Sequence, residues 1–171
     1  MDICGAKLRV FGSAVYDQDT LLPQVAIGVQ HKMNDRGGLL SALGARDSTG
    51  TDFYLSATKL FLSSSLLVNA TLRETKANQL GILGFGGKDN SYRTQVEVSG
   101  AYLISRKFAI GGEYRMKPDN LAFARESDWV DAFVAWFPTK NFSLTAAYVL
   151  LGDIALQKNQ NGVYLSAQVG F

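Results

Sequence analysis

Apolar and polar residues alternate with a period of two along almost the whole chain. Val96 and Val98, for example, flank Glu97. Such alternation is typical of β-strands that bury one face, and no segment sustains the spacing of an amphipathic helix. The pattern predicts nine strands, over residues 6–16, 24–32, 52–62, 66–76, 93–105, 108–117, 129–137, 142–151 and 162–171.

The predicted connections alternate between short and long. Short links are expected at residues 17–23, 63–65, 105–107 and 138–141, and longer ones at 33–51, 77–92, 118–128 and 152–161. Strands of about 9–11 residues can cross a bilayer when tilted, and bacterial outer-membrane barrels have short periplasmic turns and longer external loops. The fold class expected is therefore all-β, an antiparallel up-and-down transmembrane β-barrel located in the outer membrane of a Gram-negative bacterium.

Composition alone does not reveal a membrane protein. The 171 residues are 47% hydrophobic and 19% charged, and the mean hydropathy of +0.02 fits both a transmembrane barrel and a soluble β-sandwich. No apolar run approaches the roughly 18 residues that a membrane-spanning helix needs.

The net charge of +2 gives no electrostatic reason to expect a nucleic-acid partner. Cys4 is the single cysteine and no Cys/His cluster accompanies it, so neither a metal nor a cofactor is expected.

Strand number suggests that the chain is part of a larger domain. If the C-terminus is periplasmic, nine alternating strands place the start of the first strand outside the cell, whereas single-chain bacterial barrels have an even number of strands. The N-terminus also lacks the apolar segment of a signal peptide. We therefore expect residues 1–171 to be the C-terminal part of a single barrel domain, with one or more N-terminal strands missing.

The C-terminal strand ends in a pattern that resembles the membrane-insertion signal of outer-membrane proteins. A terminal aromatic residue follows apolar residues at every second position, and these residues are Val163, Leu165, Ala167, Val169 and Phe171. We expect outer-membrane lipid and the barrel-assembly machinery as partners.

The polar faces of the strands define a candidate lumen. Its predicted lining residues are Lys7, Arg9, Lys32, Arg73, Glu97, Glu113, Arg115, Lys117 and Asp131. Mixed charge of this kind either lines a water-filled passage for a small solute or closes a small barrel as an ionic core, and both readings stay open. Residues 78–87, NQLGILGFGG, form an unusually apolar loop that is expected to pack on neighbouring loops, to fold inward as a plug or to contact a hydrophobic solute.

Register follows from the shared lipid-facing parity of neighbouring strands. The short link at 105–107 predicts that Glu97 lies directly opposite Arg115. A second register, across the long loop 118–128, places Arg115 opposite Asp131. Arg115 would then bridge two carboxylates.

Three stretches carry a family resemblance: GSAVYDQDTLLPQVAIGVQHK, TKLFLSSSLLVNATLRETKANQLGILGFGG and GGEYRMKPDNLAFARESDWVDAFVAWFPTKNFSLTAAYVLLGDIA. They resemble a proteobacterial family of outer-membrane proteins catalogued as a domain of unknown function. Members of that family look longer at the N-terminus, with a signal peptide and further strands. The resemblance implies an outer-membrane barrel and brings no catalytic residue with it.

The function expected is a pore or transporter-type barrel for small or hydrophobic solutes, and the alternative is a structural barrel without transport. An outer-membrane acyl hydrolase would need a serine, a histidine and an orienting acid or amide. His31 is the single histidine and no GxSxG motif accompanies it, so we do not expect an enzyme. A soluble β-sandwich or an adhesin-like binding module is the third hypothesis, and a requirement for detergent would distinguish the barrel from it.

Overall fold

A single antiparallel sheet makes up most of the molecule. The computed structural model describes residues 1–15, 20–121, 126–154 and 157–170, and within them nine strands follow one another in chain order. They are β1 (Asp2–Phe11), β2 (Gln24–Met33), β3 (Thr49–Phe61), β4 (Leu66–Thr75), β5 (Arg93–Ser105), β6 (Phe108–Arg115), β7 (Trp129–Thr139), β8 (Phe142–Ile154) and β9 (Gln157–Val169). The prediction of an all-β fold with nine up-and-down strands is confirmed.

Two short helical segments lie in the connections. Helix α1 (Gly37–Ala42) lies between β2 and β3, and the 3-10 turn η1 (Asn78–Gly81) lies between β4 and β5. In the described part of the chain no helix has the length and apolar character needed to span a membrane.

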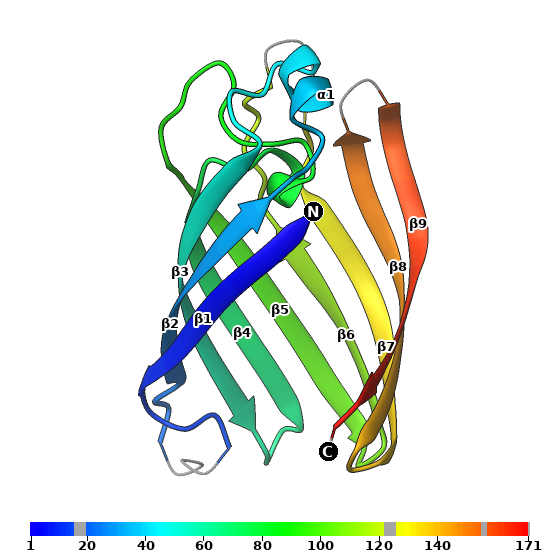
Figure 1. The fold of residues 1–171 in the computed structure, drawn as a ribbon. Helices are drawn as coiled ribbons and strands as arrows, with labels where there is room; N and C mark the ends of the chain where they lie inside the picture. The colour runs from blue at the N-terminus through cyan, green and yellow to red at the C-terminus, as the bar shows by residue number, and fades with distance from the viewer. Residues whose placement is uncertain (16–19, 122–125, 155–156, 171) are drawn as a thin grey trace.

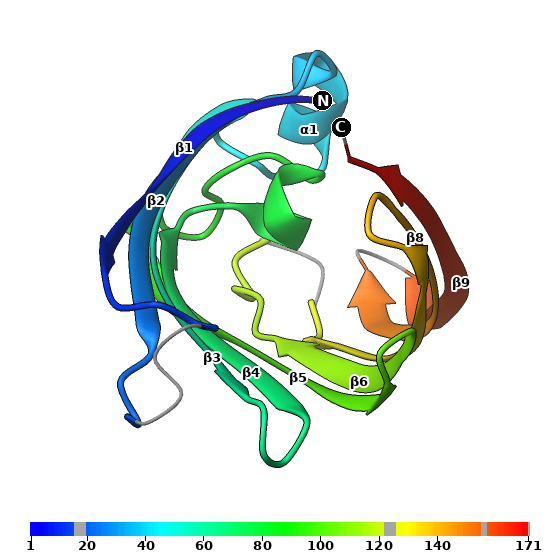
Figure 2. The ribbon, with the colours of Figure 1, turned by 90° about the horizontal axis from the view of Figure 1, so that it is seen from below.

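The sheet curls around an interior but is not closed (Figures 1 and 2). Each strand pairs with its neighbours in sequence, and β1 and β9 form no ladder with each other in the part that the structure describes. Because alternate strands of an up-and-down sheet run in opposite directions, β1 and β9 point the same way. These two edges therefore cannot meet as an antiparallel pair.

The first strand lies earlier in the chain than predicted. It spans Asp2–Phe11 rather than residues 6–16, and residue 16 lies outside the described part. Its register shifts between Arg9 and Phe11, which brings Phe11 opposite Val25. Gly12 follows with φ of 69°, and a Cβ there would lie 2.3 Å from the carbonyl oxygen of Pro23. This bulge and glycine end the strand where the alternation alone continues, so the connection to β2 is longer than the predicted link at 17–23.

The last hairpin is longer than predicted. β8 continues to Ile154 and β9 begins at Gln157, so the expected long link at 152–161 is wrong. Pairing continues through Gly152 opposite Gln160, with register shifts on either side. The residues here are polar and include Gly152 and Asn159 at positive φ. The polar composition of residues 152–161 predicts a loop, but strand pairing continues there in an irregular form. A smaller difference is that β6 ends at Arg115, two residues before the predicted end.

The two faces of the sheet carry opposite kinds of side chain. The outward, convex face exposes large apolar residues, including Ile27, Phe53, Leu55, Leu72, Val98, Tyr102, Ile110, Val134, Tyr148 and Leu165. The inward, concave face buries polar and charged residues, including Lys32, Asp52, Ser56, Thr71, Arg73, Gln95 and Glu97. This distribution is the reverse of that in a water-soluble protein, where apolar side chains fill the interior and charged side chains are mostly exposed.

Candidate functional site

Four charged side chains form a row across the concave face of β2 to β5. The row consists of Lys32, Asp52, Arg73 and Glu97. The Lys32 Nζ lies 2.6 Å from a carboxylate oxygen of Asp52, and an Arg73 guanidinium nitrogen lies 3.6 Å from the same oxygen. On its other side, Arg73 donates to Glu97 over 2.6 Å. We call these four residues the ion-pair row.

Strand register positions the ion-pair row and supplies further partners. Gln30 lies opposite Asp52, and Tyr54 lies opposite Arg73. Gln30 accepts a hydrogen bond of 2.9 Å from Arg73, and the Arg73 guanidinium carbon lies 5.1 Å from the centre of the Tyr54 ring. Thr75 donates to Asp52, which is fully buried. Two cations and two anions are thus neutralised inside the sheet, as buried charges require.

The predicted ladder around Arg115 is correct on one side and wrong on the other. Glu97 lies directly opposite Arg115, which confirms the first register. Across the next strand pair, however, Arg115 lies opposite Trp129, and Asp131 lies opposite Glu113. Arg115 bonds Glu113 on its own strand instead of bridging Glu97 and Asp131. The long β6–β7 connection can absorb a shift of two residues without changing which face each side chain occupies, so parity alone could not determine this register.

The other residues predicted to line the interior occupy different surroundings. Lys7 and Arg9 lie opposite Gly28 and Ala26 on β2, and both side chains are exposed beside the open seam. Lys117 lies beyond the end of β6 and is buried.

Sequence reasoning missed residues on which the site depends. Asp52, Gln30 and Tyr54 occupy alternate strand positions with concave-face parity, so the alternation contained the signal for all three. Gln79 and Glu126 lie in connections, where no periodic pattern marks a buried polar residue.

The connection between β4 and β5 enters the interior as a compact turn, and Figure 2 shows η1 inside the ring of strands. We call residues 78–85 the inserted turn. The Leu80 carbonyl oxygen accepts a hydrogen bond of 2.9 Å from Lys32 Nζ, and the Gln79 side-chain oxygen accepts one of 2.9 Å from Lys117 Nζ. Phe85 is buried against Gly50, where a Cβ would lie 2.2 Å from its ring. The inward fold expected as one possibility for loop 78–87 is therefore present.

The inserted turn also packs against neighbouring connections. The backbone N–H groups of Arg46 and Asp47 both donate to the Phe85 carbonyl oxygen. Nearby, Leu40 and Leu121 form a small apolar cluster with Ala45, against which Leu83 packs. Described residues of the three long connections thus meet at one end of the sheet and form a cap, of which the inserted turn is the inner part.

Lys117 and Glu126 form a second buried charged group at the edge of the inserted turn. The Lys117 Nζ lies 4.7 Å from the centre of the Trp129 ring. Within the described residues, the Glu126 carboxylate faces Lys117 and Gln79, which lower its pKa against the larger effect of burial. Burial raises the pKa of Glu126 to about 7 and lowers the pKa of Lys117 to about 8.

The C-terminal apolar residues lie on the convex face of β9. Val163, Leu165, Ala167 and Val169 lie opposite Tyr148, Ala146, Leu144 and Phe142 of β8. Phe171, the last residue of the predicted insertion signal, lies outside the described residues.

His31 lies apart from the ion-pair row, on the convex face. It faces Cys4 on β1 and Thr51 on β3, and its Nδ1 lies 2.9 Å from the Thr51 hydroxyl oxygen. This arrangement adds nothing to the acyl-hydrolase hypothesis.

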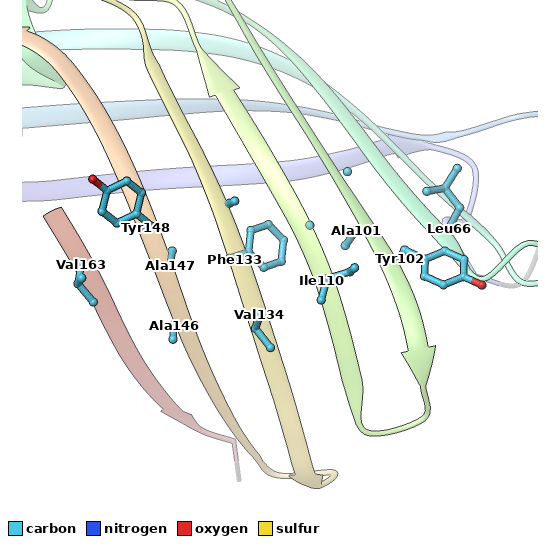
Figure 3. A pocket seen from close by; sticks show the side chains of 13 residues that line it. Leu66, Ala101, Tyr102, Ile110, Phe133, Val134, Ala146, Ala147, Tyr148 and Val163 are labelled. Carbon is cyan, nitrogen blue, oxygen red and sulfur yellow. The ribbon is translucent and has the colours of Figure 1, made fainter. Parts of the chain in front are cut away.

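A shallow apolar pocket crosses β4 to β9 (Figure 3). Small residues such as Gly100, Ala132 and Ala146 lie between larger ones such as Tyr102 and Tyr148. Cross-strand pairing places these five residues on the convex face, so this face is hollowed as well as apolar.

Comparisons with known proteins identify a family. No curated protein and no solved structure matches the chain. A family profile described as "Protein of unknown function (DUF3034)" matches residues 1–168. The match takes in all nine strands except the last residue of β9, together with the ion-pair row and the inserted turn, and the chain therefore belongs to the DUF3034 family.

Proposed function

We propose that the chain forms most of an outer-membrane β-barrel of a Gram-negative bacterium, with an interior passage for small or hydrophobic solutes. The observation that carries the proposal is the reversed distribution of side chains. Val98 and Leu72 are about half exposed on the convex face, whereas Asp52 is fully buried on the concave face. A barrel in lipid requires this arrangement, because its outer surface contacts acyl chains and its interior holds polar groups.

The strand edges support a barrel with further strands. β1 and β9 run in the same direction, so closure by antiparallel pairing needs an odd number of additional strands between them. Nine strands plus an odd number gives the even total of bacterial single-chain barrels. Closure would also remove the two unpaired edges, which otherwise invite aggregation.

The interior supports a passage that is partly filled by protein. Lys7 and Arg9 are exposed on the concave face, as charged residues lining water would be. The ion-pair row and the inserted turn occupy other parts of the interior. These two features also suit a structural barrel without transport, which we keep as the second candidate.

The first prediction concerns location and behaviour in detergent. We expect the protein to fractionate with outer membranes and to migrate differently on gels before and after boiling. A closed barrel satisfies its backbone hydrogen bonds internally and therefore resists detergent until heated. Recovery as a soluble monomer without detergent would contradict the proposal. Ion conductance of the purified protein in a planar bilayer would then separate a passage from a purely structural barrel.

A further inference from the structure

We propose that the inserted turn is a gate across the capped end of the passage, held shut by Lys32 on one wall and by a Lys117–Gln79–Glu126 latch on the other. The inference rests on the proposed function in that it assumes a passage. Its conformational part, the movement of the turn, can be measured without transport.

The two anchors lie on different walls of the interior. Lys32 belongs to β2, and Lys117 follows β6, four strands further along the sheet. Figure 2 shows η1 within the ring that these strands form. Adjacent residues of the turn reach the two anchors, Leu80 through its carbonyl oxygen and Gln79 through its side chain. The turn therefore spans the interior instead of lying along one wall.

Backbone conformation indicates that contacts hold the turn in place. Gln79 has φ of 46° and Leu80 has φ of 59°, both in the left-handed region that L side chains rarely adopt. Consecutive residues persist there when surrounding contacts fix them. A turn in this state can relax when an anchor weakens.

The latch holds polar groups that the closed state leaves incompletely bonded. Glu126 is 8% exposed and Gln79 is 1% exposed. Within the described residues, neither the Glu126 oxygens nor the Gln79 amide nitrogen makes a well-aligned hydrogen bond, although Gln79 lies close enough to Glu126 to lower its pKa. Burying an ionised carboxylate with incomplete hydrogen bonding raises the free energy of the closed gate. Burying a protonated carboxyl group raises it far less.

Protonation of Glu126 therefore favours the closed gate. The pKa of Glu126 is about 7 when buried, against 4.5 for the unperturbed group, so the closed state keeps a proton between these values that the open state releases. Raising the pH through this range favours opening. Lys117 acts oppositely: its pKa is about 8 when buried, against 10.5 unperturbed, so raising the pH from 8 to 10.5 favours closure. The gate is least stable between pH 7 and pH 8.

Two further carboxylates of the β6–β7 connection, Asp119 and Asp128, act on the latch. Asp119 contributes to the raised pKa of Glu126, and Asp128 raises the pKa of Lys117 against the effect of burial. Trp129 supplies an aromatic face to Lys117 but carries no charge. Glu126 is the carboxylate of this cluster whose pKa burial raises to about 7.

The test compares the full chain with its Glu126→Gln variant, both in vesicles and both carrying Trp136→Phe so that Trp129 is the one tryptophan left. Acrylamide quenching of Trp129 reports how open the latch is to water. In the protein that keeps Glu126, we expect quenching of Trp129 to rise at least about twofold between pH 5 and pH 7.5. With Glu126→Gln, a neutral side chain of the same shape, quenching stays at its pH 5 level. At pH 7 the fraction of molecules with an open gate is expected to be at least about tenfold lower in Glu126→Gln than in the protein with Glu126. Bilayer conductance at pH 7 is expected to fall by the same factor.

Two variants make the test decisive. Asp35→Asn removes an exposed carboxylate from another connection and is expected to leave the pH profile unchanged. Gln79→Met removes the latch contact and is expected to raise quenching at pH 5 to the level seen at pH 7.5. A pH profile that neither Glu126→Gln nor Gln79→Met changes overturns the gate. A profile that changes as expected in a protein without conductance supports the moving turn and contradicts the passage.

Discussion

Arg73→Met is expected to lower the free energy of unfolding by about 3–5 kcal/mol. Arg73 lies between Asp52 and Glu97 in the ion-pair row, and its side chain is about nine-tenths buried. Methionine fills similar space but carries no charge. Glu97 then loses its closest cation, and Asp52 keeps Lys32 as its one cationic partner in the ion-pair row. Urea unfolding of the protein refolded into vesicles measures the loss.

Arg93→Met is the matched control for this substitution. Arg93 pairs with Asp89 at a separation of 2.7 Å, but both side chains are well exposed. Because exposed pairs contribute little to stability, Arg93→Met is expected to lower the free energy of unfolding far less than Arg73→Met. The double variant Arg73→Met/Glu97→Met removes both buried partners and is expected to recover part of the loss. Equal effects of Arg73→Met and Arg93→Met would contradict a buried ion-pair row.

Val98→Arg is expected to destabilise the protein by about 2–4 kcal/mol in a bilayer. Val98 lies near the middle of β5 on the convex face, opposite Ala70 and Tyr114, and it is about half exposed. If this face contacts acyl chains, a charged side chain there must be moved or solvated at a cost. If the face contacts water, a surface substitution changes stability by no more than about 0.5 kcal/mol.

Ser99→Arg is the control for Val98→Arg. Ser99 is the next residue on the same strand, so its side chain points to the concave face, and Glu113 lies directly opposite. An arginine there can share that carboxylate with Arg115 and is expected to cost less than Val98→Arg. The contrary order, measured by the same unfolding assay, would mean that the faces are assigned the wrong way round.

Strand faces and short-link registers could be predicted from the sequence. Alternation determines which residues share a face, and the tight β5–β6 link leaves little freedom, so the pairing of Glu97 with Arg115 was predicted correctly. The β6–β7 register was not, because its long connection permits a shift of two residues that preserves parity.

Features that depend on the backbone of the connections could not be predicted. The bulge before Gly12 ends β1 early, and no property of the alternation signals it. The path of the inserted turn depends on left-handed residues such as Gln79 and on the space that Gly50 leaves for Phe85. These are tertiary effects, which local periodicity does not encode.

Spin labels placed at successive positions of β5 test most directly whether the convex face contacts lipid. Each residue from Gln95 to Leu103 is replaced in turn by a labelled cysteine, in a Cys4→Ser protein reconstituted in vesicles. Labels at even-numbered positions such as Val98 and Tyr102 are expected to be accessible to oxygen dissolved in lipid and protected from a water-soluble nickel complex. Labels at odd-numbered positions such as Ser99 are expected to be shielded from lipid. Two results would contradict the account. One is that labels at Val98 and Tyr102 collide with the nickel complex as often as labels in the exposed connections do. The other is that accessibility along β5 shows no period of two.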